Sequence, residues 1–530
     1  MRLRLCMGSL VFPKTLRSML NCFAVAFALA PAWSLAQVPP VDAAGQSDFQ
    51  ANTHFLTFIG SYVPETVASA KAYYKAIDPT GSKVTFTKWL VNAGFIADES
   101  QWHSTGKQLI ACNNPGCDLP AGTYGDNVIN TDSHVIILNA ADLGFVRNQF
   151  IRCKPSCTAK NPIIYTYLEN YPVAPFAAGP GGSGFPVATG YPTAAEAKAA
   201  IQSAITRPIG TVNGQKIDRI ADVAFEWAPP ATKPTSTTRY GQLYAYIFHR
   251  DSSNNITETI DWPNDQPFLD TVFNSRQANA SPSQFPPAET VLAGDPFAPE
   301  LDARGVKQMP GVCLVCHGGQ PQNLTSTGAY PRGGKLDGFR FLPIDVANMN
   351  FTSDNDAGDA LSRAAQEAQI KQYNKAVLLT VDQSAHGDGT GAKRQAHLAE
   401  VIKGWYAGFP GDQNMSAPTQ NANFVPVGWT GHEKLYLQTV ATSCRSCHFN
   451  RELSLDFGTL ANFNQESDIL QLALLPFCNA NTPGYSLDRR LRPMPLARLT
   501  YQRYWQSRLD GNIANNFGFA TTPAYCATNP

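Results

Sequence analysis

The stretch GVCLVCHGGQ, residues 311–320, places two cysteines and a histidine within five positions, in the order C-x-x-C-H. The same order returns in SCRSCHFN, residues 443–450. The first set is Cys313, Cys316 and His317, and the second set is Cys444, Cys447 and His448. Because the order and the spacing repeat, we expect the same chemistry at both places, and the second half of the chain must fold around it.

The spacing of these residues suits the covalent attachment of haem. In C-x-x-C-H the two thiols lie one helical turn apart and can add across the two vinyl groups of one haem, and the next residue brings an imidazole to the iron. A redox dithiol needs no trailing histidine, and a four-ligand zinc site leaves both histidines unexplained. We therefore expect two covalently attached haem c groups, with His317 and His448 as the proximal iron ligands.

Charge and length exclude several classes of function. The chain has 530 residues, which suggests more than one folding unit. It carries 41 lysines and arginines against 41 aspartates and glutamates, so its formal net charge is zero. No basic field attracts nucleic acid or an acidic lipid surface, and we expect neither as a partner.

Residues 1–36 have the pattern of a cleaved export signal. Basic residues up to Arg17 precede the apolar run MLNCFAVAFALA, and the small residues of SLA predict cleavage after Ala36. The alternative is a membrane anchor, but this run is shorter than the roughly 20 residues that a spanning helix needs. We expect a periplasmic or secreted mature chain without a membrane span.

The cysteines outside the two motifs predict disulfides. The chain has 12 cysteines, of which Cys6 and Cys22 precede the cleavage position and four belong to the motifs, so six remain. An even number in an exported chain is typical of disulfide pairing. Alternatives are a crossed pairing between the first four of the six, or a zinc site from those four, although their spacing is looser than a zinc knuckle. The local spacing favours Cys112–Cys117, Cys153–Cys157 and Cys478–Cys526.

Residues 37–275 predict an α+β domain with a mostly antiparallel sheet. A helix is expected over 64–77 and another near 194–205. No catalytic motif is found in this region, and its role stays open. Short runs of β-branched and aromatic residues predict strands at 133–139, 162–171, 219–227, 242–250 and 256–262.

After a linker at 276–300, rich in proline and serine, the pattern becomes helical. We expect a mainly α-helical region with a first cytochrome c-like lobe at 301–430 and a second at 431–530. Apolar residues at helical spacing predict helices over 359–380, 393–409, 432–443, 467–477 and 495–507.

Residues 300–530 resemble the bacterial di-haem c-type cytochromes, on the strength of the two motifs. The run HEKLYLQTVATSCRSCH, residues 432–448, is similar to the c-type arrangement in which an amphipathic helix leads into the attachment site. The first motif departs from that pattern, because the run before it is short and broken at Pro310. The resemblance implies electron transfer between a periplasmic donor and a periplasmic acceptor protein.

The sixth iron ligands are less well defined. For the second haem, Met494 lies in RPMP, 46 residues after His448, and its alternative role is to fill a gap in the core. For the first haem, the candidates are Met349, one of the histidines between the motifs, or an open position. Those histidines are His386, His397 and His432.

An enzyme is the alternative function. The chain is more distantly similar to di-haem peroxidases and to the di-haem oxygenases that cleave polyisoprenes, in which one haem supplies electrons and the other reacts. The haem with Met494 would then be closed and the haem at Cys313 reactive. Gln366 and Glu367 are candidates for distal groups by position alone.

Overall fold

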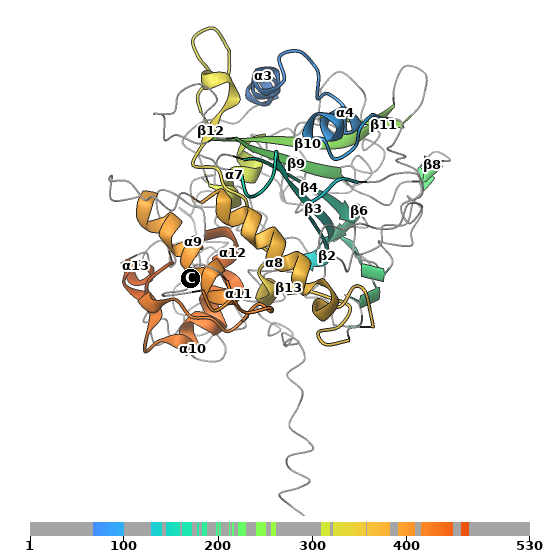
Figure 1. Cartoon of the computed structure of the whole chain (residues 1–530). Coiled ribbons are helices and arrows are strands. Elements are labelled where there is room, and N and C mark those ends of the chain that lie inside the picture. The colour runs from blue at the N-terminus through green and yellow to red at the C-terminus, as the bar shows by residue number, and fades with distance from the viewer. Residues whose placement is uncertain are drawn as a thin grey trace, which may run out of the picture. The chain divides into compact units, whose positions relative to one another are not determined.

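The computed structural model describes these parts of the chain: residues 67–99, 129–139, 145–159, 162–171, 221–228, 240–250, 256–260, 309–318, 322–381 without 357, 391–408, 415–448 and 457–465, with short pieces between 177 and 216. All of them belong to one compact unit, Val38–Pro530 (Figure 1). The predicted export signal lies outside the described residues.

An antiparallel sheet forms the centre of the described structure (Figure 1). A short strand, β12 (Leu336–Asp337), pairs with the start of β10. Two small ladders lie outside the sheet, β5 (Ala177–Gly179) with β6 (Ser183–Val187) and β7 (Thr211–Val212) with β8 (Gln215–Lys216). The strand order of the main sheet is β11 (Ile256–Ile260), β10 (Tyr240–Arg250), β9 (Ala221–Ala228), β4 (Ile163–Tyr171), β3 (Val146–Lys154), β2 (Ser133–Asn139) and β13 (Met349–Asn350).

The predicted antiparallel sheet is confirmed, and all five predicted strands are present as β2, β4, β9, β10 and β11. Every residue of β2, SHVIILN, is buried, which explains why its sequence reads as a continuous apolar run rather than an alternation. The tyrosines of β4 stand on one face of the sheet, where Tyr167 packs against Trp89, and the aromatic residues of β9 stand on the other, where Phe225 packs against His317.

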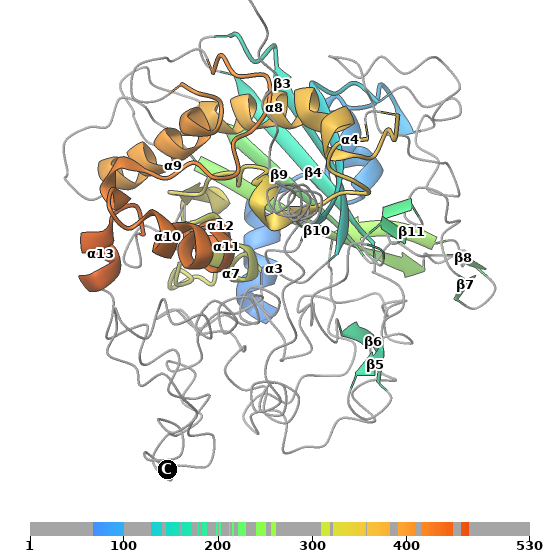
Figure 2. The same ribbon diagram turned by 90° about the horizontal axis from the view of Figure 1, so that it is seen from below.

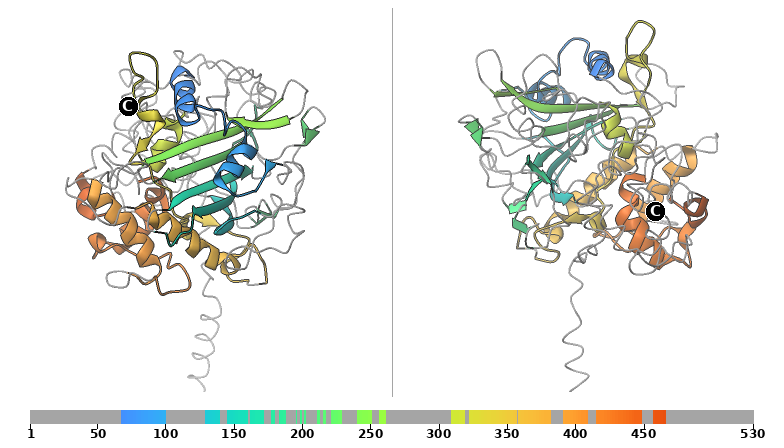
Figure 3. Two further views of the ribbon diagram at one scale, coloured as in Figure 1. Left: turned by 45° about the horizontal axis from the view of Figure 1, so that its top comes forward. Right: turned by 180° about the vertical axis from the view of Figure 1, so that it is seen from behind.

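Helix α4 (Phe86–Ala93) covers one face of the sheet (Figure 3). Thr85 caps its start by accepting a hydrogen bond from Lys88, and Gly94 ends it in the left-handed conformation. The rings of Phe86 and Trp89 pack edge-on against Tyr167 of β4, with centroids 5.4 and 6.1 Å away. The helix therefore closes an aromatic core on this side.

Helix α8 (Arg363–Leu379) lies along β2 and supplies the hydrogen bonds that a neighbouring strand would otherwise make. Gln366 Oε1 accepts from the Ile136 N–H at 2.7 Å, and its Nε2 donates to the Ile136 carbonyl at 3.0 Å. Gln369 Oε1 accepts from the N–H of His134 at 3.3 Å. Beyond the two residues that β13 pairs, the edge of the sheet is thus closed by side chains.

Two tyrosine hydroxyls form hydrogen bonds with backbone N–H groups of β10 that no neighbouring strand pairs. Helix α3 (Val67–Ile77) brings Tyr73 and Tyr74 to the part of β10 that lies between its pairings with β12 and β11. The Tyr73 hydroxyl accepts from the Leu243 N–H at 2.8 Å, and the Tyr74 hydroxyl accepts from the Ala245 N–H at 3.2 Å. Buried backbone donors are thereby satisfied.

The remaining described helices carry the two cysteine–histidine motifs or lie near them, except η4 (Pro331–Gly334), which packs against α3 (Figures 1 and 2). Three predicted helices are confirmed by α8, by α9 (Gly391–Trp405) and by the run from Glu433 to Ser443, while the predicted helices at 467–477 and 495–507 lie outside the described residues. The others are α7 (Gly311–His317), η4 (Pro331–Gly334), η5 (Val346–Asn348), η6 (Val427–Trp429), α10 (Glu433–Leu435), the π-helical turn η7 (Tyr436–Val440), α11 (Ala441–Ser443), α12 (Arg445–His448) and α13 (Leu460–Gln465).

The sheet takes strands from both sides of the predicted linker. β12 and β13 come from the predicted first lobe, yet they pair with β10 and β2 of the predicted α+β domain. One hydrophobic cluster runs from α3 to Met415. The boundaries at 275, 300 and 430 stay predictions, and the described elements on either side of the linker share one core. No helix among the described residues has the length and apolar character to cross a bilayer.

Candidate functional site

The two C-x-x-C-H motifs lie side by side, although they are far apart in the sequence. Helices α7 and α12 are in contact (Figures 1 and 2). The Sγ atoms of Cys316 and Cys447, the second cysteine of each motif, lie 3.3 Å apart. None of the motif cysteines, which are Cys313, Cys316, Cys444 and Cys447, forms a disulfide. The sequence predicted two lobes and did not predict this contact between their motifs.

In the first motif the histidine is oriented by a backbone carbonyl. Helix α7 ends at Gly318, whose φ of 78° suits glycine, and the chain leaves the helix just after His317. The Nδ1 of His317 lies 2.9 Å from the carbonyl oxygen of Arg340. An acceptor there places the proton on Nδ1, so the lone pair is on Nε2, where a metal can bind it. Removal from water lowers the pKa of His317 to about 4 and keeps the ring neutral.

Aromatic side chains enclose this imidazole. The ring of His317 lies 4.8 Å from that of Phe225 on β9 and 5.2 Å from that of Phe339. Phe339 in turn lies directly over Gly241 of β10, where an added Cβ would stand 1.8 Å from its ring. Glycine at this position allows Phe339 to reach the sheet, and the two phenylalanines exclude water from one side of the histidine.

In the second motif the residue after the first cysteine is a buried arginine. Arg445 is 1 % exposed, and its Nε and Nη2 donate to the two carboxylate oxygens of Asp345 at 2.8 and 2.7 Å. Its Nη1 donates to the Tyr436 hydroxyl at 3.3 Å, and its guanidinium lies over the ring of Trp405. Burial lowers the pKa of Arg445, but Asp345 and Tyr436 more than offset this and raise it above its ordinary value. This bidentate pair fixes the start of α12.

The rest of the second motif is also well packed. Cys444 is buried, and burial raises the pKa of its thiol to about 12, so the sulfur is neutral at neutral pH. The ring of His448 stacks on Phe457 with centroids 4.4 Å apart. Phe457 is held in place because its carbonyl accepts from the indole N–H of Trp429 at 2.9 Å. The proximal-ligand candidate of this motif therefore has an ordered apolar neighbour.

One stretch of chain contacts both motifs. We call Leu336–Asn350 the bridging segment. It presents the Arg340 carbonyl to His317 and the Asp345 carboxylate to Arg445. At both ends it is anchored in the sheet, since β12 pairs with β10 and β13 pairs with β2. The bridging segment thus positions the two motifs relative to each other and to the sheet.

A further contact strengthens the bridging segment on the side of the second motif. Asn348 donates from Nδ2 to the Ala441 carbonyl at 2.8 Å, three residues before Cys444, and to the Asp345 carboxylate at 2.8 Å. Asp345 also accepts from the N–H of Ala347, which caps η5. Sequence reasoning missed both residues. The one signal was an acid and two asparagines inside the apolar run FRFLPIDVANMNF, residues 339–351, where buried polar groups need partners.

The predicted sixth ligands remain untested. Met349 lies in β13, opposite Asn139, and is buried. Of the histidine candidates, His397 is buried on α9 and His432 is exposed just before α10. Met494 and His386 lie outside the described residues.

The two candidates for distal groups hold the fold together. Gln366 bonds to the backbone of β2 as described above. Glu367 accepts from the backbone N–H of Gln420 and from Arg363 Nε, the latter at 3.2 Å. Burial raises the pKa of Glu367. Both side chains therefore use their polar atoms to join α8 to its neighbours.

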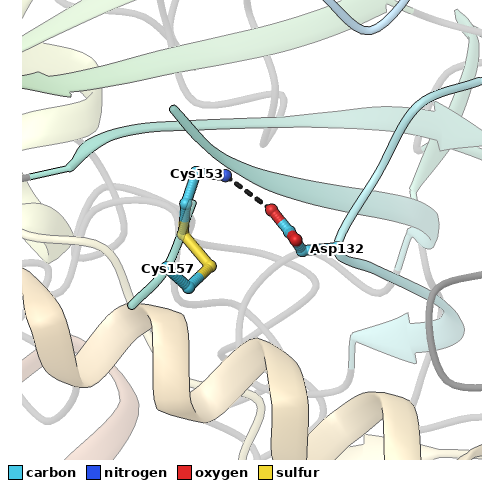
Figure 4. Close-up of side chains that lie close together, drawn as sticks. All are labelled: Asp132, Cys153 and Cys157. Carbon is cyan, nitrogen blue, oxygen red and sulfur yellow. Dashed lines mark hydrogen bonds between the residues drawn. A yellow bond between two sulfur atoms is a disulfide. The ribbon is translucent and has the colours of Figure 1, made fainter. Parts of the chain in front are cut away.

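The predicted disulfide between Cys153 and Cys157 is confirmed (Figure 4). It excludes the predicted alternatives in which either of these cysteines pairs with Cys112 or Cys117 or binds zinc, while Cys112–Cys117 and Cys478–Cys526 lie outside the described residues. Asp132 lies beside the disulfide and accepts from the Cys153 N–H at 2.7 Å. These three residues form a compact group, but sulfurs bonded to each other cannot serve as thiolate ligands.

Comparison with known proteins adds no relative. No family model matches the chain, and neither a curated protein nor a solved structure matches it. The resemblance to di-haem c-type cytochromes thus depends on the two motifs and their surroundings.

Proposed function

We propose that the chain is an exported di-haem c-type cytochrome, which binds two haems covalently and transfers electrons between periplasmic redox partners. The observation that carries the proposal is the pairing of two C-x-x-C-H motifs on adjacent helices, with all four thiols outside any disulfide. In C-x-x-C-H the two thiols of each motif can form thioethers with one haem, and the histidine that follows can bind its iron.

At the first site, Cys313 and Cys316 would tether the haem and His317 would bind its iron. When bound, the haem supplies a one-electron redox centre. The hydrogen bond from His317 Nδ1 to the Arg340 carbonyl fixes the tautomer and the orientation of the ring. Phe225 and Phe339 limit the access of water to the histidine. A hydrogen bond to the ring nitrogen that does not bind the metal, together with apolar neighbours, is expected around a ligating histidine.

At the second site, Cys444 and Cys447 would tether the haem and His448 would bind its iron. The pair Arg445–Asp345 holds the short helix that carries Cys447 and His448. Phe457 lies against the imidazole and limits its rotation. The residues present at both sites fit a covalent haem in the number and order of their donors.

Electron transfer is favoured over the enzymatic alternative by the contacts of Gln366 and Glu367. A peroxidase or oxygenase needs polar groups beside an open iron position to handle the oxygen substrate. The two residues that the sequence nominated use their polar atoms to hold α8 against β2 and Gln420. Electron transfer requires no such groups.

The test is the haem content of the full chain, exported in a host that attaches haem c. We expect two haems per chain, retained after denaturation, by the pyridine haemochrome spectrum and haem-stained gels. The variant Cys313→Ala with Cys316→Ala, and the variant Cys444→Ala with Cys447→Ala, should each retain one.

Cys153→Ala with Cys157→Ala is the matched control. It removes two cysteines as well, but it should retain both haems, because these cysteines form the disulfide. A folded, exported chain that carries no haem, or whose haem is extracted by acid and organic solvent, contradicts the proposal.

A further inference from the structure

We propose that the disulfide Cys153–Cys157, together with Asp132, is a thiol–disulfide exchange site that oxidises a substrate carrying two thiols. The bridge is reduced to two thiols, and the substrate dithiol becomes a disulfide. This inference is independent of haem, because both cysteines lie outside the C-x-x-C-H motifs. It goes beyond the proposed function, which gives these cysteines no chemical role.

The two cysteines of the bridge differ in their access to solvent. Cys153 belongs to β3 and is 3 % exposed, whereas Cys157 follows β3 in a surface turn and is partly exposed. Between them, Pro155 and Ser156 are exposed. An incoming thiolate attacks the sulfur that it can reach, and the other sulfur leaves. The arrangement therefore makes Cys157 the attacked sulfur and Cys153 the leaving group.

A purely structural role explains this bridge poorly. The sequence separation of its cysteines is 4, and a disulfide constrains the unfolded chain less when the loop that it closes is short. The end of β3 is already held by its ladder with β4, in which Cys153 pairs with Ile164 and Lys154 with Ile163. Exposed disulfides are the ones that exchange readily with thiols. The position of the bridge thus favours a reactive role.

Asp132 supplies a carboxylate where the exchange must move protons (Figure 4). Its Oδ2 accepts from the Cys153 N–H at 2.7 Å, and a carboxylate oxygen lies within 4.8 Å of both sulfurs. Among the residues that the structure describes, no other carboxylate forms such a group with this bridge. One water molecule can span a separation of this size and carry a proton across it. Asp132 is partly exposed, so water reaches it.

The exchange consists of two displacements. In the first, Asp132 takes the proton of one substrate thiol, the resulting thiolate bonds to Cys157 Sγ, and the bond between Cys157 and Cys153 breaks. Cys153 leaves as a thiolate and receives the proton from Asp132. In the second, the other substrate thiol loses its proton to Asp132 and attacks the substrate sulfur of the mixed disulfide. Cys157 then leaves and is protonated, so two electrons have passed from the substrate to the bridge.

The first measurement is reduction of the bridge in the folded, exported full chain. A synthetic peptide with two thiols is added under nitrogen, samples are quenched with acid and alkylated, and peptide mapping reads Cys153 and Cys157. We expect reduction without denaturant and an equal yield of oxidised peptide. Reduced glutathione has one thiol, which Cys153 displaces again, so it should reduce the bridge about tenfold more slowly. Equal rates with the two reagents would overturn the dithiol substrate.

The second measurement compares variants under the same conditions. Asp132→Asn keeps an oxygen that can accept from the Cys153 N–H but cannot take a proton, and it should slow reduction by the peptide about tenfold or more. Asp356→Asn is the matched control, because Asp356 also accepts from a backbone N–H, that of Gly358 at 3.0 Å, and it should keep the native rate. Oxidised glutathione should attach to Cys157 in Cys153→Ser, and it should not attach to Cys153 in Cys157→Ser.

The outcomes separate this inference from the proposed function, because the mapping reads Cys153 and Cys157 alone. A bridge that is reduced only after the chain is unfolded overturns the exchange site, whether or not the chain carries haem. A folded chain without haem whose bridge exchanges supports the site and overturns the cytochrome. Equal rates in the native chain and in Asp132→Asn overturn the site as proposed. Where a variant does not fold, reduction of the native chain by the peptide decides.

Discussion

At the scale of single residues, Arg445 joins the second motif to the rest of the fold. It lies between the two thiols of that motif and is nearly inaccessible to water. A buried guanidinium is tolerable only with its charge paired and its donors satisfied, and Asp345, Tyr436 and Trp405 supply those contacts. Arg445 therefore holds the second motif in place and also contributes to the stability of the fold.

Asp345→Asn is expected to destabilise the protein by about 3–5 kcal/mol, because it leaves the charge of Arg445 buried and unpaired. The measurement is urea unfolding followed by tryptophan fluorescence. The double variant Asp345→Leu with Arg445→Met should recover much of the loss, since a well-packed apolar pair often replaces a buried ion pair without cost. A double variant less stable than Asp345→Asn would argue against the ion pair as the cause.

His134 predicts a pH dependence of stability. It is fully buried on β2, and burial lowers its pKa to about 4 from the ordinary 6.5. The unfolded chain binds a proton at this histidine before the folded chain does, so its contribution is complete above pH 6.5 and falls as the pH drops towards 4, by about 3 kcal/mol in all. The free energy of unfolding, measured between pH 7 and 4, should fall less steeply in His134→Gln. An equal slope in the native protein and in His134→Gln would contradict this role of His134.

At the scale of elements, side chains form hydrogen bonds with the backbone of the sheet where no neighbouring strand pairs with it, on β2 and on β10. Gln366 and Gln369 accept hydrogen bonds from the backbone N–H groups of β2. Tyr73 and Tyr74 do the same for β10. These contacts explain how polar residues can be buried in a helix that packs on a sheet. A prediction from the spacing of apolar residues does not count these buried polar side chains, and it therefore underestimates how much of α8 is buried.

Gln366→Leu is expected to cost about 1–3 kcal/mol, because it leaves the N–H and the carbonyl of Ile136 buried without their partner. Hydrogen exchange at the Ile136 amide should become faster than in the native chain. Gln372→Leu, on the same helix but only partly buried, should change neither the stability nor that exchange rate. Equal effects of the two substitutions would contradict the role of Gln366 as the hydrogen-bond partner of the Ile136 backbone.

The strands that sequence reasoning found and missed differ in composition. β2, β4, β9, β10 and β11 are rich in β-branched and aromatic residues and were predicted. β3, VRNQFIRCK, was missed because Arg147 and Arg152 interrupt its apolar positions, although it lies between two other strands. β12 and β13 have two residues each, too few for a pattern, and only their partners in the sheet define them.

At the scale of the whole molecule, the contact between the two motifs makes a prediction for the chain before haem attachment. In protein made without haem attachment, a mild oxidant should link Cys316 to Cys447, whose sulfurs are 3.3 Å apart. Peptide mapping by mass spectrometry would identify the link. Cys447→Ser should abolish it. A disulfide confined to Cys313 and Cys316 in the native sequence would contradict the observed arrangement of α7 and α12.

The sequence by itself determined the two C-x-x-C-H sets, and its local spacing and periodicity predicted five strands of the main sheet, the helices α8 and α9, and the Cys153–Cys157 bridge as the favoured pairing. Only the tertiary structure decided that the motifs touch and that the bridging segment holds both. The contacts of the second motif with the bridging segment and with the first motif join distant residues, since Asp345 and Arg445 are 100 positions apart and Cys316 and Cys447 are 131 apart. Chain spacing carries no information about such pairs, since packing around the sheet alone brings them together.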